Sequence, residues 1–251
     1  MRRILLGMGL VGTLAVVVVG ATAAGDSPDK GTLARRGDQE ALRGFGPLVG
    51  AWRGTGQVRR GSNQGAWTET SDWAWKLAAD SARLEIQVAK GKYLRSAMLA
   101  PVEGKPGAFT LEAVLADGSK RTFQSEPPVA DASQPVAFRA IEPGEGVRRI
   151  SLAIPNDARF LLTYEALPTK AAGTGWVRLG EVGSTRVGAS FAAGESGPVC
   201  IVTGGRGTIQ VSHAGKSYWV CCSGCRDLFQ DDPAAVLAEA AAKKEKDAAK
   251  P

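Results

Sequence analysis

Cysteine and histidine are scarce in this 251-residue chain, and their distribution excludes several kinds of chemistry. The first 199 residues contain no cysteine, and the one histidine is His213. Catalysis that depends on a histidine base or on a Ser–His–Asp triad is therefore excluded from everything before that residue. No pairing of a nucleophile with a base is recognisable elsewhere, so we expect a protein that is not an enzyme.

Long apolar runs are also lacking, except at the start of the chain. After Met1-Arg2-Arg3 the sequence is apolar or small from Ile4 to Ala24 and closes with Ala21-Thr22-Ala23. This pattern predicts a signal peptide over residues 1–24 and an exported protein, periplasmic or extracellular. The alternative is an uncleaved membrane anchor, because about 20 apolar residues also span a bilayer. No cysteine lies near this segment, so a lipid-anchored lipoprotein is not supported.

The sequence also lacks a concentrated basic surface, although its formal net charge is +6. Basic residues are scattered in short groups such as Arg59-Arg60 and Arg148-Arg149, without interleaved aromatic residues. Grooves that bind single-stranded nucleic acid combine the two. We therefore expect no nucleic-acid partner.

What the chain does contain, between residues 46 and 192, is a succession of short strand-like segments separated by glycine, proline and aspartate. Residues 25–45 before it are polar and small, and we assign them to a linker, with a short helix as the alternative. The predicted strands are Ala51–Arg59, Trp67–Leu77, Ala82–Ala89, Tyr93–Leu99, Ala108–Leu115, Lys120–Gln124, Val136–Ile141, Arg148–Ile154, Phe160–Ala166 and Trp176–Thr185.

Apolar and polar residues alternate in several of these segments, as in Phe109–Leu115. Alternation predicts one buried and one solvated face, and turns such as Asp117-Gly118 suit hairpins. About ten antiparallel strands without intervening helices fit a closed up-and-down β-barrel, because closure leaves no exposed sheet edge. We therefore predict a mainly β fold with a calycin-like barrel over residues 46–192.

The first predicted strand carries a family resemblance. The stretch Leu48-Val49-Gly50-Ala51-Trp52-Arg53-Gly54-Thr55-Gly56 resembles the first strand of lipocalin-like and nitrobindin-like barrels. The resemblance implies a ten-stranded barrel with a possible small apolar ligand, and Trp52 is expected to plug its core. A haem-binding nitrobindin needs a histidine ligand, and the predicted barrel, residues 46–192, contains no histidine.

A second domain is predicted over residues 196–251, after the linker Ala192–Pro198, and it holds all four cysteines. Cys200, Cys221 and Cys225 follow the spacing Cys-x20-Cys-x3-Cys. Two β-prone runs, 208–212 and 217–220, predict a hairpin, and a helix is expected to begin near residue 223. The three thiols can then face one point. Thiolates select zinc or copper over magnesium or calcium, and the dipole at a helix start favours the thiolate.

Zinc usually takes a fourth ligand, and Cys222 and His213 are the two local candidates, whereas trigonal Cu(I) needs neither.

The same domain resembles the TRASH and YHS metal-binding modules. Gly215-Lys216-Ser217-Tyr218-Trp219-Val220-Cys221 is similar to their Gly-Lys-x-Tyr-x-x-Cys strand, and Phe229 with Asp232-Pro233 matches their Phe-x-x-Asp-Pro ending. The resemblance implies a module that senses, buffers or traffics a heavy-metal ion. Separately, the membrane is expected as a partner only if the apolar N-terminal segment stays uncleaved.

Two other uses of the cysteines remain open. Disulfides between Cys200 and either Cys221 or Cys225 would staple a small module in an exported protein, leaving the barrel to bind an apolar ligand. Cys222-Ser223-Gly224-Cys225 is also a C-x-x-C sequence, but no βαβ pattern surrounds it, as a thioredoxin-like redox pair would require. Metal ligation is the favoured hypothesis.

Overall fold

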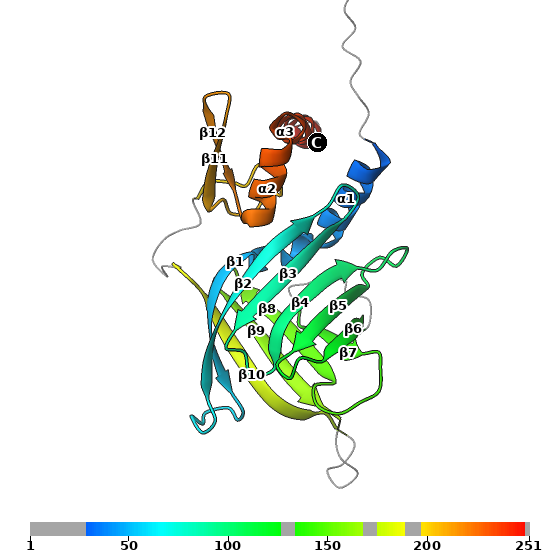
Figure 1. Ribbon diagram of the computed structural model, residues 1–251, viewed down its shortest axis with the longest axis vertical. Coiled ribbons are helices and arrows are strands. Elements are labelled where there is room, and N and C mark those ends of the chain that lie inside the picture. Colours follow the sequence, from blue (N-terminus) through cyan, green and yellow to red (C-terminus); the bar gives the residue numbers. More distant parts are fainter. Residues whose placement is uncertain (1–28, 127–133, 168–174, 189–196, 249–251) are drawn as a thin grey trace, which may run out of the picture.

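The computed structural model describes residues 29–126, 134–167, 175–188 and 197–248 (Figure 1). The predicted signal peptide lies outside this part of the chain. Ten strands make up the first domain: β1 Gly50–Gln57, β2 Trp67–Leu77, β3 Ala82–Ala89, β4 Leu94–Pro101, β5 Phe109–Leu115, β6 Lys120–Glu126, β7 Val136–Ala140, β8 Arg149–Asn156, β9 Arg159–Ala166 and β10 Val177–Arg186.

The ten strands form a closed antiparallel barrel, as the sequence predicts. Each strand pairs with its neighbours in sequence, and β1 completes the circle by pairing with β10. Inward-facing residues alternate with outward-facing ones along each strand; on β5, Phe109, Leu111, Ala113 and Leu115 are buried. Because side chains alternate with a period of two, this pattern places one row of apolar residues in the barrel interior.

One end of the barrel is closed by the segment before β1. The predicted linker 25–45 contains helix α1 (Lys30–Ala41) and the start of a 3-10 helix, η1 (Arg43–Leu48), so the helical alternative is the one that the structure shows. Phe45 and Leu48 are buried, and Phe45 packs edge to face on Phe109 with ring centroids 5.1 Å apart. Helix α1 itself contacts β3 and β4. Packing on the barrel stabilises this helix of few apolar residues, and its local sequence does not reveal that contact.

Trp52 is a core residue, as predicted. Its side chain is 1% exposed, and its ring lies edge to face against Phe160 with centroids 4.7 Å apart. The indole Nε1 donates a hydrogen bond of 2.7 Å to the Leu48 carbonyl. The residue therefore joins β1 to the 3-10 helix that closes the barrel.

The C-terminal module consists of a hairpin and two helices. Strands β11 (Ile209–His213) and β12 (Lys216–Val220) are joined by a two-residue turn in which Ala214 and Gly215 both have positive φ, which suits a right-twisted hairpin. Helix α2 (Ser223–Asp231) follows, then α3 (Pro233–Ala248). Asp232 accepts a hydrogen bond from the Ala235 amide at 2.9 Å and so caps α3.

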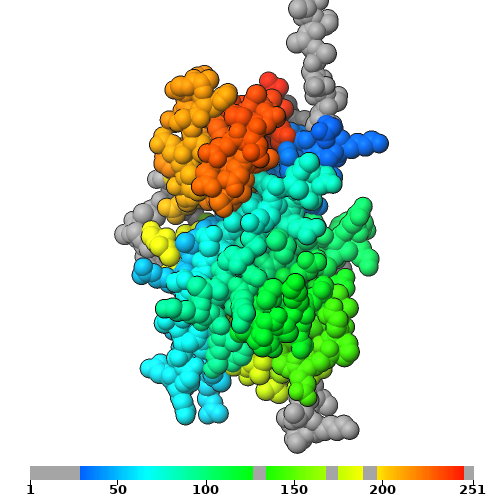
Figure 2. All heavy atoms as spheres, viewed as in Figure 1, coloured from blue at the N-terminus to red at the C-terminus, as the bar shows by residue number. Residues whose placement is uncertain are grey.

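The module rests on the end of the barrel that α1 also covers (Figures 1 and 2). Helix α2 contacts β2. On α3, Glu239 accepts a hydrogen bond of 2.9 Å from the buried Arg35 of α1. Across the described residues, every helix is too short or too polar to cross a membrane.

Candidate metal centre

The loop that carries Cys200 is held in a tight turn by its own backbone. The Cys200 amide donates to the Gly205 carbonyl at 2.7 Å, and the Gly204 amide donates back to the Cys200 carbonyl at 2.9 Å. The next residue ties the loop to the hairpin, because the Ile201 amide donates to the Trp219 carbonyl at 2.8 Å. The Cys200 thiol is thereby fixed opposite the end of β12.

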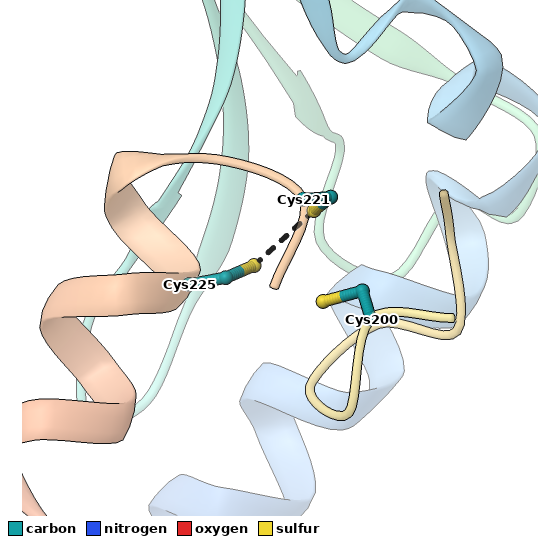
Figure 3. Close-up of side chains that lie close together, drawn as sticks. All are labelled: Cys200, Cys221 and Cys225. Carbon is teal, nitrogen blue, oxygen red and sulfur yellow. Dashed lines mark hydrogen bonds between the residues drawn. The ribbon is translucent and has the colours of Figure 1, made fainter. Parts of the chain in front are cut away.

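Cys221 and Cys225 lie on either side of the start of α2. Cys221 follows β12 directly, and Cys225 lies in the first turn of the helix, as the sequence predicts. Their sulfur atoms are 3.5 Å apart. Figure 3 shows these two thiols and that of Cys200, which lies on a separate loop, directed toward one another.

The three sulfur atoms of Cys200, Cys221 and Cys225 all lie within 4.8 Å of one another. A tetrahedral or trigonal ion with metal–sulfur bonds of about 2.3 Å separates its thiolates by roughly 3.8 Å, so the site needs only small adjustments to hold one ion. The side chains are 1%, 5% and 0% exposed, respectively, which excludes water from the space between them. The arrangement can hold a thiophilic metal ion.

The two candidates for a fourth ligand lie outside this set of three thiols. Cys222 has its sulfur 3.9 Å from that of Cys221 and also accepts a hydrogen bond of 3.4 Å from the Trp75 amide of the barrel, so it contacts the cluster without lying within 4.8 Å of all three sulfur atoms. His213 ends β11 and packs edge to face on Phe229, with centroids 6.5 Å apart.

Hydrogen bonds among the thiols divide them into acceptors and donors. Hydrogen bonds from Cys221 and then Cys225 lower the pKa of Cys200, and the same two thiols lower the pKa of Cys222. Each donor thiol has one proton, so it serves one acceptor at a time. Donation to Cys200 in turn raises the pKa of Cys221 and of Cys225. These hydrogen bonds favour anionic sulfur at the acceptor thiols, and a bound cation must displace the protons of the two donor thiols.

The four cysteines are not joined by disulfide bonds in this structure. All four cysteines are free thiols. A disulfide holds its sulfur atoms at about 2.05 Å, whereas those of Cys221 and Cys225 are 3.5 Å apart.

Sequence reasoning missed a further polar neighbour of the cluster, Thr203. Its hydroxyl oxygen lies 3.4 Å from the Cys221 sulfur. No local pattern marks this threonine, because the turn after Cys200 is what carries it to the sulfur.

Apolar side chains that face the barrel interior leave a small pocket between them. This pocket is lined by Trp73, Leu99, Phe138 and other apolar side chains, and it leaves a free volume of about 10 Å³. A small-molecule ligand generally needs about 300–1,000 Å³.

The comparisons with known proteins assign neither domain to a family. The chain matches no protein-family model and no curated protein. A crystal structure of Rv2717c from M. tuberculosis is 15% identical, covers 58% of this chain and 96% of its own, and has a TM-score of 0.39. The structure of EF1p2_mFAP2b bound to DFHBI is 10% identical, covers 58% of this chain and 98% of its own, and has a TM-score of 0.25.

Proposed function

We propose that this chain is an exported, non-enzymatic protein that binds one zinc or copper ion through Cys200, Cys221 and Cys225, and so senses, buffers or traffics that metal. The observation that carries the proposal is the convergence of three buried sulfur atoms to within 4.8 Å of one another. The resemblance of this segment to TRASH and YHS modules supports it, and the apolar N-terminal segment supports export.

The chemistry of the donor set favours soft and borderline ions. Thiolates bind Cu(I) and Zn(II) strongly, whereas magnesium and calcium prefer oxygen ligands. Burial strengthens this selection, because water cannot replace a sulfur ligand inside the cluster. Two separate segments of chain supply the ligands, the loop at Cys200 and the stretch from Cys221 to Cys225, so metal binding also stabilises the fold of the module.

The proposal is tested by measuring metal content and accessible thiols on protein purified under reducing conditions. We expect one bound or bindable zinc or copper ion per chain, with the cluster thiols protected from a thiol reagent until a chelator is added. Cys225→Ser should weaken metal binding by more than about 100-fold. Losing a residue that only hydrogen-bonds a metal ligand typically weakens binding by about 10- to 100-fold. Ser223→Ala, an exposed neighbour on the same helix, is the matched control.

Two results would remove the proposal. The first is a reduced, folded protein that takes up neither zinc nor copper. The second is Cys225→Ser binding metal as tightly as Ser223→Ala. A native protein without free thiols would instead favour the disulfide-stapled alternative, in which the barrel carries the function.

A further inference from the structure

Strand β2 projects beyond its neighbour β1 at the end of the barrel that meets the module. The pairing of β1 with β2 ends at Gly50 and Trp73. Trp75 lies beyond this point and pairs only with Leu84 of β3. Its other side is thus an open sheet edge, and a buried edge needs a partner for its backbone groups.

Cys222 and Gly224, which lie between Cys221 and Cys225, cover this edge. The Trp75 amide donates its hydrogen bond to the Cys222 sulfur at 3.4 Å. Gly224 lies against the Trp75 carbonyl group so closely that a Cβ atom there would overlap the carbonyl oxygen and lie 2.9 Å from the carbonyl carbon. Only glycine permits this approach. Residues between two candidate ligands, Cys221 and Cys225, are therefore the ones that dock on the barrel.

This contact determines where the fourth thiol lies. The Cys222 sulfur is 3.9 Å from the Cys221 sulfur, yet it lies outside the group of three that are mutually within 4.8 Å. The Trp75 amide bond and the close approach of Gly224 to the Trp75 carbonyl group hold Cys222 at this edge of the barrel. A metal-bound thiolate can still accept an amide hydrogen bond, so it is the position imposed by these two contacts that keeps the sulfur out of the group of three. Docking on the barrel therefore opposes a fourth sulfur ligand.

We propose that the barrel withholds Cys222 from the metal and keeps the centre three-coordinate, so that the protein selects Cu(I) over Zn(II). The inference rests on the proposed function and adds the selectivity of the same site. Structural zinc sites are almost always four-coordinate, whereas soft thiolate ligands suit Cu(I). Trp75 and Gly224 are positioning residues in this scheme, because they act through Cys222 and do not touch the ion.

The test is to separate the module's helix start from β2 with Gly224→Ala and to titrate the full-length protein with Cu(I) and Zn(II). We expect Zn(II) affinity to rise by about tenfold or more as Cys222 becomes available, with Cu(I) affinity changed by less than about threefold. Adding Cys222→Ser to Gly224→Ala should abolish the gain. Gly37→Ala, a helical glycine with no atom within 4 Å of its added Cβ, should leave both affinities unchanged.

Co(II), used as a probe for Zn(II), reports the number of sulfur ligands through its thiolate charge-transfer absorption. That absorption should be about one third stronger in Gly224→Ala than in the wild type, because four thiolates would bind the ion in place of three. If Gly224→Ala does not fold, Cys222→Ser alone decides, because the inference expects it to bind both metals as the wild type does.

The inference is overturned if wild-type protein shows four thiolates on Co(II), or if Cys222→Ser alone weakens Zn(II) binding by about tenfold or more. In either case the proposed metal-binding function stands. Failure of the wild type to bind either ion refutes the proposed function itself.

Discussion

The ion pair between Arg35 and Glu239 joins the segment that closes the barrel to the last helix of the module, and its loss should loosen that junction. The two side chains are 9% and 30% exposed, and the nitrogen-to-oxygen distance is 2.9 Å. Arg36 approaches the other carboxylate oxygen at 3.5 Å. Glu239→Ala removes the acceptor and leaves the Arg35 guanidinium buried.

The expected cost follows from that burial. Breaking a fully buried pair by removing one partner costs about 3–5 kcal/mol, whereas an exposed pair contributes about 0–1 kcal/mol. Because Glu239 is partly exposed, we expect Glu239→Ala to lower the free energy of unfolding by about 2 kcal/mol. Glu40→Ala is the matched control, since it removes a helical pair with Arg43 whose side chains are 67% and 64% exposed.

Urea unfolding followed by tryptophan fluorescence measures the difference, and hydrogen exchange locates it. The protection of α3 amides should fall in Glu239→Ala and stay unchanged in Glu40→Ala. Adding Arg35→Met to Glu239→Ala should recover part of the loss, because no unpaired charge is then buried. Equal costs for the two alanine variants, within about 0.5 kcal/mol, would show that the pair does not hold the module on the barrel.

Three further predictions concern the barrel and the metal centre. Trp52→Phe leaves the Leu48 carbonyl without its donor and should cost about 1–3 kcal/mol in denaturant unfolding; an unchanged midpoint would contradict this account. Burial raises the pKa of Glu69 above 4.5 despite the hydrogen bond from Trp67. Above pH 4.5 the carboxyl group therefore stays protonated in the folded protein when it has already ionised in the unfolded chain. The contribution of Glu69 to the free energy of unfolding thus declines as pH rises above 4.5. Glu69→Gln should remove that part of the decline, and parallel stability–pH curves for variant and wild type would disprove it. A bound ion at a free concentration of 100 times its Kd should stabilise the module by about 2.7 kcal/mol, so that a chelator lowers the melting temperature of the wild type but not of Cys225→Ser.

Local sequence patterns were sufficient to predict where the barrel strands begin and end. The predicted bounds of β2 and β3 coincide with those observed, and the other barrel strands agree closely. These patterns suffice because the side-chain period of a strand is a property of the backbone itself. The cysteine spacing was sufficient in the same way for the cluster of Cys200, Cys221 and Cys225, since a hairpin and the first turn of a helix are short-range structures.

The position of Cys222, by contrast, depends on the tertiary structure. From sequence it is a candidate fourth ligand, and its contact with Trp75 joins residues 147 positions apart. The sequence also left undecided whether the segment before the barrel is a linker or a helix. The helix Lys30–Ala41 is stabilised by the barrel end on which it packs, and local sequence does not show that contact. Periodicity and spacing encode what a few neighbouring residues do, whereas the meeting of two distant segments depends on how the closed barrel and the module fit together.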